Sequence, residues 1–252
     1  MCKAIYSFLL LFVFSFVAVA QKGQDNETRL KNGEDLNMLY RNEASIGLFV
    51  HSAGGLGIAY RRGYHVTAFR NRMFEIEVQN LKHPKEVKIV NAVQSGKSFV
   101  YGKLNSFLLF RPGVGYQNVL YQKSDKKSVE IRSSYYIGAT INFAKPIYVL
   151  VKNNQSETTS TERYDPDKDS LSNIYGKADF FYGIENTKIY PGGYAKFALS
   201  FEYANRYNGI KAIETGVIGD FYPQVIPMMA FNKNPQVFVE LYLKIIWGKK
   251  WF

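Results

Sequence analysis

The chain has 252 residues and a formal net charge of +11, with 46% hydrophobic and 21% charged residues. This balance excludes wholesale disorder, and the length allows one large domain or two small ones. The positive charge favours anionic neighbours such as lipid phosphates, whereas no basic helix or recognised motif supports a nucleic-acid partner.

The first segment, residues 1–20, has the features of a secretory signal. A lysine precedes an apolar run from Ala4 to Val17, and Ala18-Val19-Ala20 forms an A-x-A cleavage site. We therefore expect residues 1–20 to be a cleaved signal peptide. The single cysteine, Cys2, falls inside it. A mature exported chain without disulfides suits a bacterial envelope protein.

The polar stretch 21–43 is expected to be a periplasmic lead-in, and 44–252 to form one domain of strands. In 128–143, most odd positions are apolar, while most even positions are polar and include Glu130 and Arg132. Alternation of this kind gives a strand one apolar face and one charged face. Ten segments with a two-residue period are predicted as strands: 45–52, 55–63, 66–79, 98–111, 114–122, 128–143, 146–152, 193–204, 209–221 and 237–248.

The connections between these segments differ in length. Short turns are predicted at 63–65, 112–113, 144–145 and 205–208, and the alternate connections are 80–97, 123–127, 153–192 and 222–236, with a short first one near 53–54. Long loops at one end and tight turns at the other are typical of bacterial outer-membrane barrels.

A membrane explains both the strand length and the alternation. Lipid offers no hydrogen-bond partners to the backbone, so only helices or closed barrels span it, and a spanning strand needs about 9–11 residues. The sequence therefore predicts an all-β, antiparallel, up-and-down transmembrane β-barrel in the outer membrane of a Gram-negative bacterium. We expect about ten strands, with eight or twelve as fallbacks. The rival is a soluble lipocalin-type barrel, which has its apolar face inside.

Two runs resemble small outer-membrane barrels of the Bacteroidota: RSSYYIGATINFAKPIYVL (132–150) and YGKLNSFLLFRPGVGYQ (101–117). The final residue, Phe252, is similar to the end of many outer-membrane barrels. Some barrels of this type are accessory subunits of the type IX secretion and gliding machinery. The resemblance thus implies envelope proteins as partners.

Alternation also assigns a set of charges to the barrel interior. Small barrels are filled by their own side chains, and buried charges must pair. We predict a salt-bridged core that plugs the lumen; a polar pathway for small solutes is the alternative. The predicted lumen charges are Arg61, Glu75, Glu77, Lys103, Arg111, Glu130, Arg132, Lys196, Glu202, Glu214, Glu240 and Lys244.

No catalytic residue is predicted. His51 and Ser52 are adjacent on a strand and point to opposite faces, so they are poorly placed as a nucleophile and base. His65 is expected in a tight turn and His83 in a long loop. An enzyme that processes lipids or peptides is the last alternative, behind a non-enzymatic scaffold and a small pore.

No metal or cofactor is predicted either. The residues Asp165, Asp167 and Asp169 resemble the start of a calcium loop, but Ser170 and Gly176 stand where glycine and glutamate are required. Lysines of the loops are candidates to bind lipopolysaccharide phosphates as point charges: Lys82, Lys85, Lys88, Lys97, Lys123, Lys126 and Lys127.

Overall fold

The computed structural model describes residues 41–90, 97–123, 128–152, 159–171, 173–203 and 209–251. All of these belong to one compact unit, Tyr40–Phe252. The predicted signal peptide, 1–20, and the lead-in as far as residue 40 lie outside the described residues. Within the described ranges, no helix is long and apolar enough to cross a membrane.

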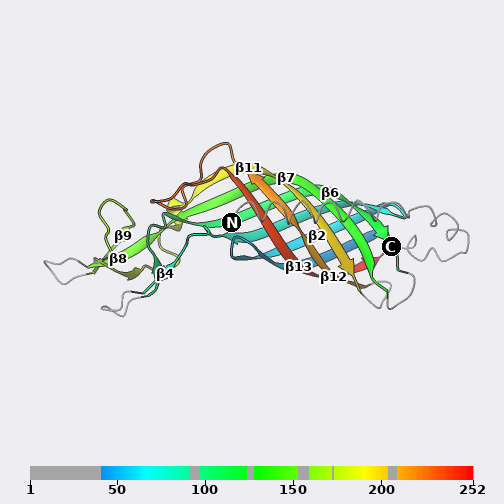
Figure 1. Ribbon diagram of the computed structural model, residues 1–252, viewed down its shortest axis with the longest axis horizontal. Coiled ribbons are helices and arrows are strands. Elements are labelled where there is room, and N and C mark those ends of the chain that lie inside the picture. Colours follow the sequence, from blue (N-terminus) through cyan, green and yellow to red (C-terminus); the bar gives the residue numbers. More distant parts are fainter. Residues whose placement is uncertain are drawn as a thin grey trace, which may run out of the picture. The chain divides into compact units, whose positions relative to one another are not determined.

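Eight of the described strands form a closed antiparallel barrel (Figure 1). Its last strand pairs with its first, from Asn42↔Trp251 to His51↔Tyr242, so the sheet has no free edge. The barrel strands are β1 (Asn42–His51), β2 (Gly55–Thr67), β3 (Arg70–Leu81), β6 (Asn105–Tyr121), β7 (Glu130–Pro146), β11 (Lys188–Glu202), β12 (Gly209–Phe221) and β13 (Val237–Trp251).

The remaining elements lie in two of the connections. Between β3 and β6, β4 (Lys88–Ile89) pairs with β5 (Phe99–Val100). Between β7 and β11, a three-stranded sheet is made by β8 (Tyr148–Lys152), β9 (Thr159–Arg163) and β10 (Ile174–Lys177), followed by the 3-10 turn η4 (Ile184–Asn186).

The prediction of ten barrel strands is wrong, and the fallback of eight is confirmed. Two expected turns lie inside strands: Pro112-Gly113 in β6 and Ala144-Lys145 in β7. The predicted strand 146–152 is mostly β8, which pairs outside the barrel. Proline removes one hydrogen bond from the ladder, yet a strand continues when pairing resumes beyond it. Here β6 and β7 pair at Phe110↔Ile141 and again at Gly113↔Gly138.

The ends of the barrel also differ from the prediction. The turn between β2 and β3 is at residues 68–69, so His65 is in β2 rather than in a turn. The connection between β6 and β7 lies at the same end as this turn, not with the long loops as expected. We call this the short-turn end. The opposite, long-loop end has connections 82–104, 147–187 and 222–236. It also has the short turn that was predicted near 53–54; it covers 52–54, where Gly54 has φ 74°.

The apolar face of the strands points outward. On β13, Val239 is 69% exposed and Leu241 55%, whereas Glu240 between them is 1% exposed. On β7, Ile137 is 67% exposed while Tyr136 is buried. A lipocalin-type barrel would show the reverse. The structure therefore supports the predicted inside-out arrangement.

Candidate functional site: the charged interior of the barrel

Arg61 of β2 lies at the centre of the barrel between two carboxylates. Its Nε donates to Glu75 Oε2 of β3 at 2.8 Å. Its Nη1 and Nη2 donate to the two oxygens of Glu214 on β12, at 2.8 and 2.9 Å. Ser200 adds a hydroxyl donor to Glu214 at 2.7 Å. The guanidinium is thus held by two strands that are far apart in the sequence.

Two lysines complete this central layer. The Nζ atoms of Lys196 on β11 and Lys244 on β13 each lie 2.6 Å from Glu77 Oε1. Lys196 also donates to Glu75 Oε1 in a close contact. With Arg61 and Glu214, the layer contains three cations and three carboxylates, so its formal charges cancel. The lysine and glutamate side chains here are at most 1% exposed. Buried charges are tolerated only with this kind of pairing.

Aromatic rings fill the space around the central layer. Arg61 Cζ lies 5.2 Å from the Tyr136 ring centroid, and Lys196 Nζ lies 4.9 Å from that of Tyr242. Lys244 Nζ is 5.0 Å from the Phe49 centroid. Cations over aromatic faces gain further stabilisation when they are desolvated. These rings and charges together occupy the lumen at this level.

A second layer lies toward the long-loop end. Arg111 of β6 forms a two-pronged pair with Asp220 of β12, with Nε 2.9 Å from Oδ1 and Nη2 in close contact with Oδ2. Glu240 Oε2 lies 3.5 Å from the same Nη2 and accepts a 2.8 Å bond from Gln79 Nε2. His51 Nδ1 is 3.5 Å from that oxygen. A two-pronged arginine–carboxylate pair forms two strong hydrogen bonds and also fixes the orientation of both side chains.

A third layer lies toward the short-turn end and is centred on Arg132 of β7. Its guanidinium meets Glu202 Oε2 at 2.8 Å, Gln117 Oε1 at 2.9 Å and Glu43 Oε2 at 3.3 Å. Lys250 Nζ lies 3.2 Å from Glu202. A cavity of about 20 Å³ beside these residues has room for about one water molecule.

An apolar cluster covers the long-loop end of the lumen. From connection 222–236, Tyr222, Ile226 and Met228 pack against inward residues of β3 and β6, including Leu81 and Phe107. The Tyr222 hydroxyl lies 3.1 Å from Thr140 Oγ1 of β7. The charged layers are therefore closed off from this side by a packed connection.

The three-stranded sheet of β8, β9 and β10 has a small core of its own. Tyr164 packs with Phe99, Ile147 and Ile174, and its hydroxyl accepts a 3.2 Å bond from the Gly102 amide. Burial raises the pKa of Tyr164 to about 12. This cluster joins the connections 82–104 and 147–187.

Eleven of the twelve predicted lumen charges lie inside the barrel and are at most 5% exposed. Lys103 is the exception: it follows β5, outside the barrel strands, and its Nζ lies 2.6 Å from Glu86. Sequence reasoning missed other charged members of the network, among them Glu43, Asp220 and Lys250. Asp220 has the same parity as Glu214, so the signal that could have found it was present.

Ser52, His83 and the aspartates of the acidic loop form local hydrogen bonds. The Ser52 hydroxyl accepts the Leu241 amide at 3.0 Å. His83 Nδ1 accepts the Lys85 amide at 3.2 Å. In the acidic loop, Asp169 Oδ2 accepts the amide of Asp165 at 2.8 Å. Among the described residues, no group of three or more His, Cys, Asp or Glu could hold a metal ion.

No protein-family model matches the chain, and no curated protein is significantly similar to it. Solved structures of similar fold include Ail, the attachment invasion locus protein of Yersinia pestis, in complex with the heparin analogue sucrose octasulfate (8% identity, TM-score 0.41, 85% of this chain and 100% of that one). Others are Neisserial surface protein A (11%, 0.38, 84% and 95%) and the N-terminal β-barrel domain of Pseudomonas aeruginosa OprF (8%, 0.35, 82% and 98%). At these identities and TM-scores the likenesses carry no argument about function or location.

Proposed function

We propose that this chain is an integral outer-membrane β-barrel, exported by the signal at 1–20, that acts as a non-enzymatic accessory or scaffold subunit. The observation that carries the proposal is the inverted distribution of side chains. Three cations and three carboxylates are buried at the barrel centre, while aliphatic residues such as Leu243 and Val239 are half or more exposed. Soluble proteins bury charges only when they are paired, as these are, and they rarely expose so continuous an apolar surface.

Strand length supports the membrane placement. The barrel strands have 10 to 17 residues, enough to cross the hydrocarbon layer with tilt. Aromatic residues near the strand ends, such as Trp247 and Tyr64, are exposed and suit the headgroup level. In this placement the long loops face outward from the cell and the short turns face the periplasm.

The filled lumen supports a function in which the loops contact partner proteins. Three charged layers and an apolar cover leave no wide passage through the described interior, so transport is the weaker reading. An aromatic patch in connection 147–187, formed by Phe180, Phe181 and Tyr182, is exposed by 61%, 78% and 51%. Patches rich in aromatics are typical of protein contacts. Membership of a type IX-like secretion complex is the finer form of this proposal and comes from the sequence resemblance.

Two experiments test the proposal at its two levels. Mature protein extracted in mild detergent should run faster on a gel before boiling than after, because a folded barrel resists the detergent. A tagged copy with the triple replacement Phe180→Ser, Phe181→Ser and Tyr182→Ser should lose an envelope partner that the unaltered copy recovers.

Mature protein that stays soluble without detergent contradicts the membrane placement. Recovery of no envelope protein by the unaltered copy contradicts the scaffold role.

A further inference from the structure

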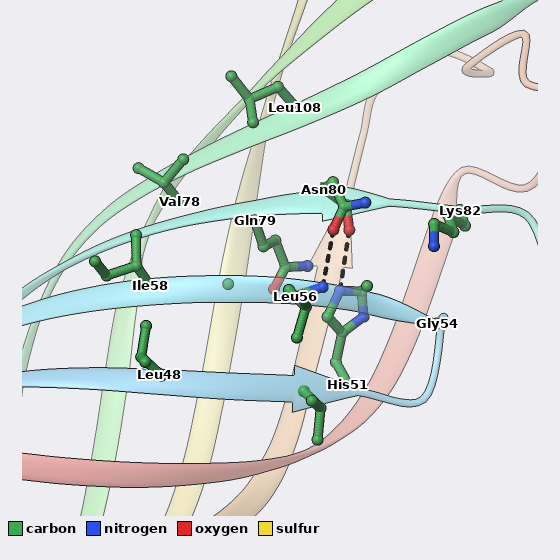
Figure 2. Close-up of a pocket in the computed structure, with 13 residues that line it drawn as sticks. Leu48, His51, Gly54, Leu56, Ile58, Val78, Gln79, Asn80, Lys82 and Leu108 are labelled. Atoms are coloured by element: carbon green, nitrogen blue, oxygen red, sulfur yellow. Dashed lines mark hydrogen bonds between the residues drawn. The ribbon is translucent and has the colours of Figure 1, made fainter.

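The outer wall of the barrel is hollowed near the long-loop end of β1, β2 and β3 (Figure 2). The groove has a volume of about 740 Å³, within the range of small-molecule sites. Its walls are outward aliphatic side chains, and Asn80 and Lys82 stand at the end nearest the loops. The aliphatic lining residues are Leu48, Val50, Leu56, Ile58, Val78 and Leu108.

Behind the groove, side chains take over from the ladder between β2 and β3, while the ladders β1–β2 and β3–β6 continue. Pairing of β2 with β3 ends at Gly57↔Gln79. Beyond that point, the Leu56 amide donates to Asn80 Oδ1 at 2.9 Å, and His51 Nε2 lies 3.0 Å from the Asn80 carbonyl oxygen. Figure 2 shows both bonds meeting at Asn80. Side-chain hydrogen bonds therefore replace ladder pairing at this point, and the hollow lies outside them, among the ridges of aliphatic side chains.

One cation is available at the rim. Lys82 is exposed and follows the end of β3 directly. Within the part of the chain that the structure describes, no acidic side chain pairs with its ammonium group. The nearby Lys85, by contrast, donates to Asn232 at 3.0 Å, and Lys103 is paired with Glu86. An apolar groove that ends at a free cation is complementary to an acyl chain that carries a phosphate-bearing head.

We propose that this groove binds one acyl chain of lipid A, with Lys82 beside a lipid A phosphate. The inference rests on the proposed membrane placement, which puts the long-loop end in the outer leaflet, where lipopolysaccharide is the phosphate-bearing lipid. The aliphatic walls take the chain, and the lysine acts as a point charge for the phosphate. This is a fixed lipid site, in contrast to the general contact of the other outward side chains with lipid.

The test uses the full mature chain in detergent micelles, with purified lipid A as the probe and native mass spectrometry as the readout. Ile58→Trp should fill the groove and remove most of the bound lipid A. Lys82→Ala should weaken binding about fivefold, the usual effect of one basic residue near an anionic lipid surface, and Lys82→Arg should restore it. Val217→Trp is the matched control, because Val217 is an outward aliphatic residue near the long-loop end of β12, away from the groove.

The outcomes separate this inference from the membrane placement. A heat-modifiable barrel that binds no lipid A, or that loses it equally with Val217→Trp, overturns the groove and leaves the placement intact. Equal binding of phosphatidylglycerol overturns the assignment to lipid A. A mature chain that needs no detergent overturns both the placement and the groove.

Discussion

The guanidinium of Arg111 has no exposed surface, and its partners come from strands on other parts of the barrel. Asp220 is on β12 and Glu240 on β13, both more than 100 residues away in the sequence. Burying such a pair gains little net stability, because desolvation of both charges offsets their attraction. Removing one partner is costly, since the other charge stays buried alone. The pair therefore links β6 to β12 and β13 across the lumen.

Replacement of this arginine should be strongly destabilising. Arg111→Met leaves Asp220 buried without its cation, and we expect the free energy of unfolding to fall by about 3–5 kcal/mol. Urea unfolding in micelles, followed by fluorescence of the two tryptophans, measures the change. Lys211→Met is the control, because Lys211 is exposed on β12 and should change stability by no more than about 0.5 kcal/mol.

A double variant tests whether the unpaired buried charge causes this loss of stability. Arg111→Met combined with Asp220→Leu removes both charges of the two-pronged pair and leaves Glu240 with Gln79 and His51. It should recover much of the lost stability, since an apolar pair of similar volume replaces the ion pair. If the single and double variants unfold at the same urea concentration, unpaired charge is not the reason for the loss.

For single residues, the alternation of the sequence predicted which side chains point into the barrel, but not which of them pair with one another. It placed Arg111 and Glu240 inside, but gave no indication that they meet, because parity contains no information about height or distance across the lumen. Glu43 and Lys250 were missed for another reason. The predicted strands began at 45 and ended at 248, whereas β1 begins at Asn42 and β13 ends at Trp251.

Three neighbouring strands fit together through two glycines. Gly113 of β6 and Gly138 of β7 both face Tyr194 of β11, and a Cβ on Gly113 would overlap the Tyr194 hydroxyl. Tyr194 itself is only 5% exposed and packs in the central cluster of the lumen. The Tyr194 ring therefore fits only because Gly113 and Gly138 have no side chains. Both glycines lie within continuous strands and serve packing rather than a turn.

Alanine at this position should disturb the barrel. Gly113→Ala pushes the Tyr194 ring out of its place, and we expect a loss of about 1–3 kcal/mol, the usual cost of overpacking. The matched control is Gly219→Ala on β12, because a Cβ there would meet nothing within 4 Å. The midpoint of urea unfolding compares the two. Equal midpoints for both variants would show that Tyr194 has room to move.

Gly113 also explains why one strand was predicted as two. Pro112-Gly113 has the composition of a turn, and local chemistry favours that reading. Pairing with β3 nevertheless runs through Ile76↔Pro112, and pairing with β7 resumes one residue later. Hydrogen bonds to two neighbouring strands outweigh a local turn preference, but they are invisible until the neighbours are known. Splitting β6 at this point, and mistaking β8 for a barrel strand, turned eight strands into ten.

At the scale of the whole molecule, the described side chains fill the interior at several levels. An eight-stranded barrel is just wide enough for its side chains to fill. Here the fill consists of the layers of Arg132, Arg61 and Arg111, with the cluster around Tyr222 above them. Each layer takes its residues from several strands, so the filling of the described interior does not depend on one connection.

This arrangement predicts an electrically silent barrel. Reconstituted in a planar bilayer, the mature protein should give no discrete conductance steps, under conditions in which a known porin gives them. Removing residues 224–235 uncovers the apolar mouth, but the bilayer should remain silent because the ion pairs of Arg111 and Arg61 still fill the lumen below it. Steps from the intact protein would support the small pore instead of the scaffold. Steps that appear only after the deletion would mean that connection 222–236 is the real barrier and that the charged layers contain a continuous water path.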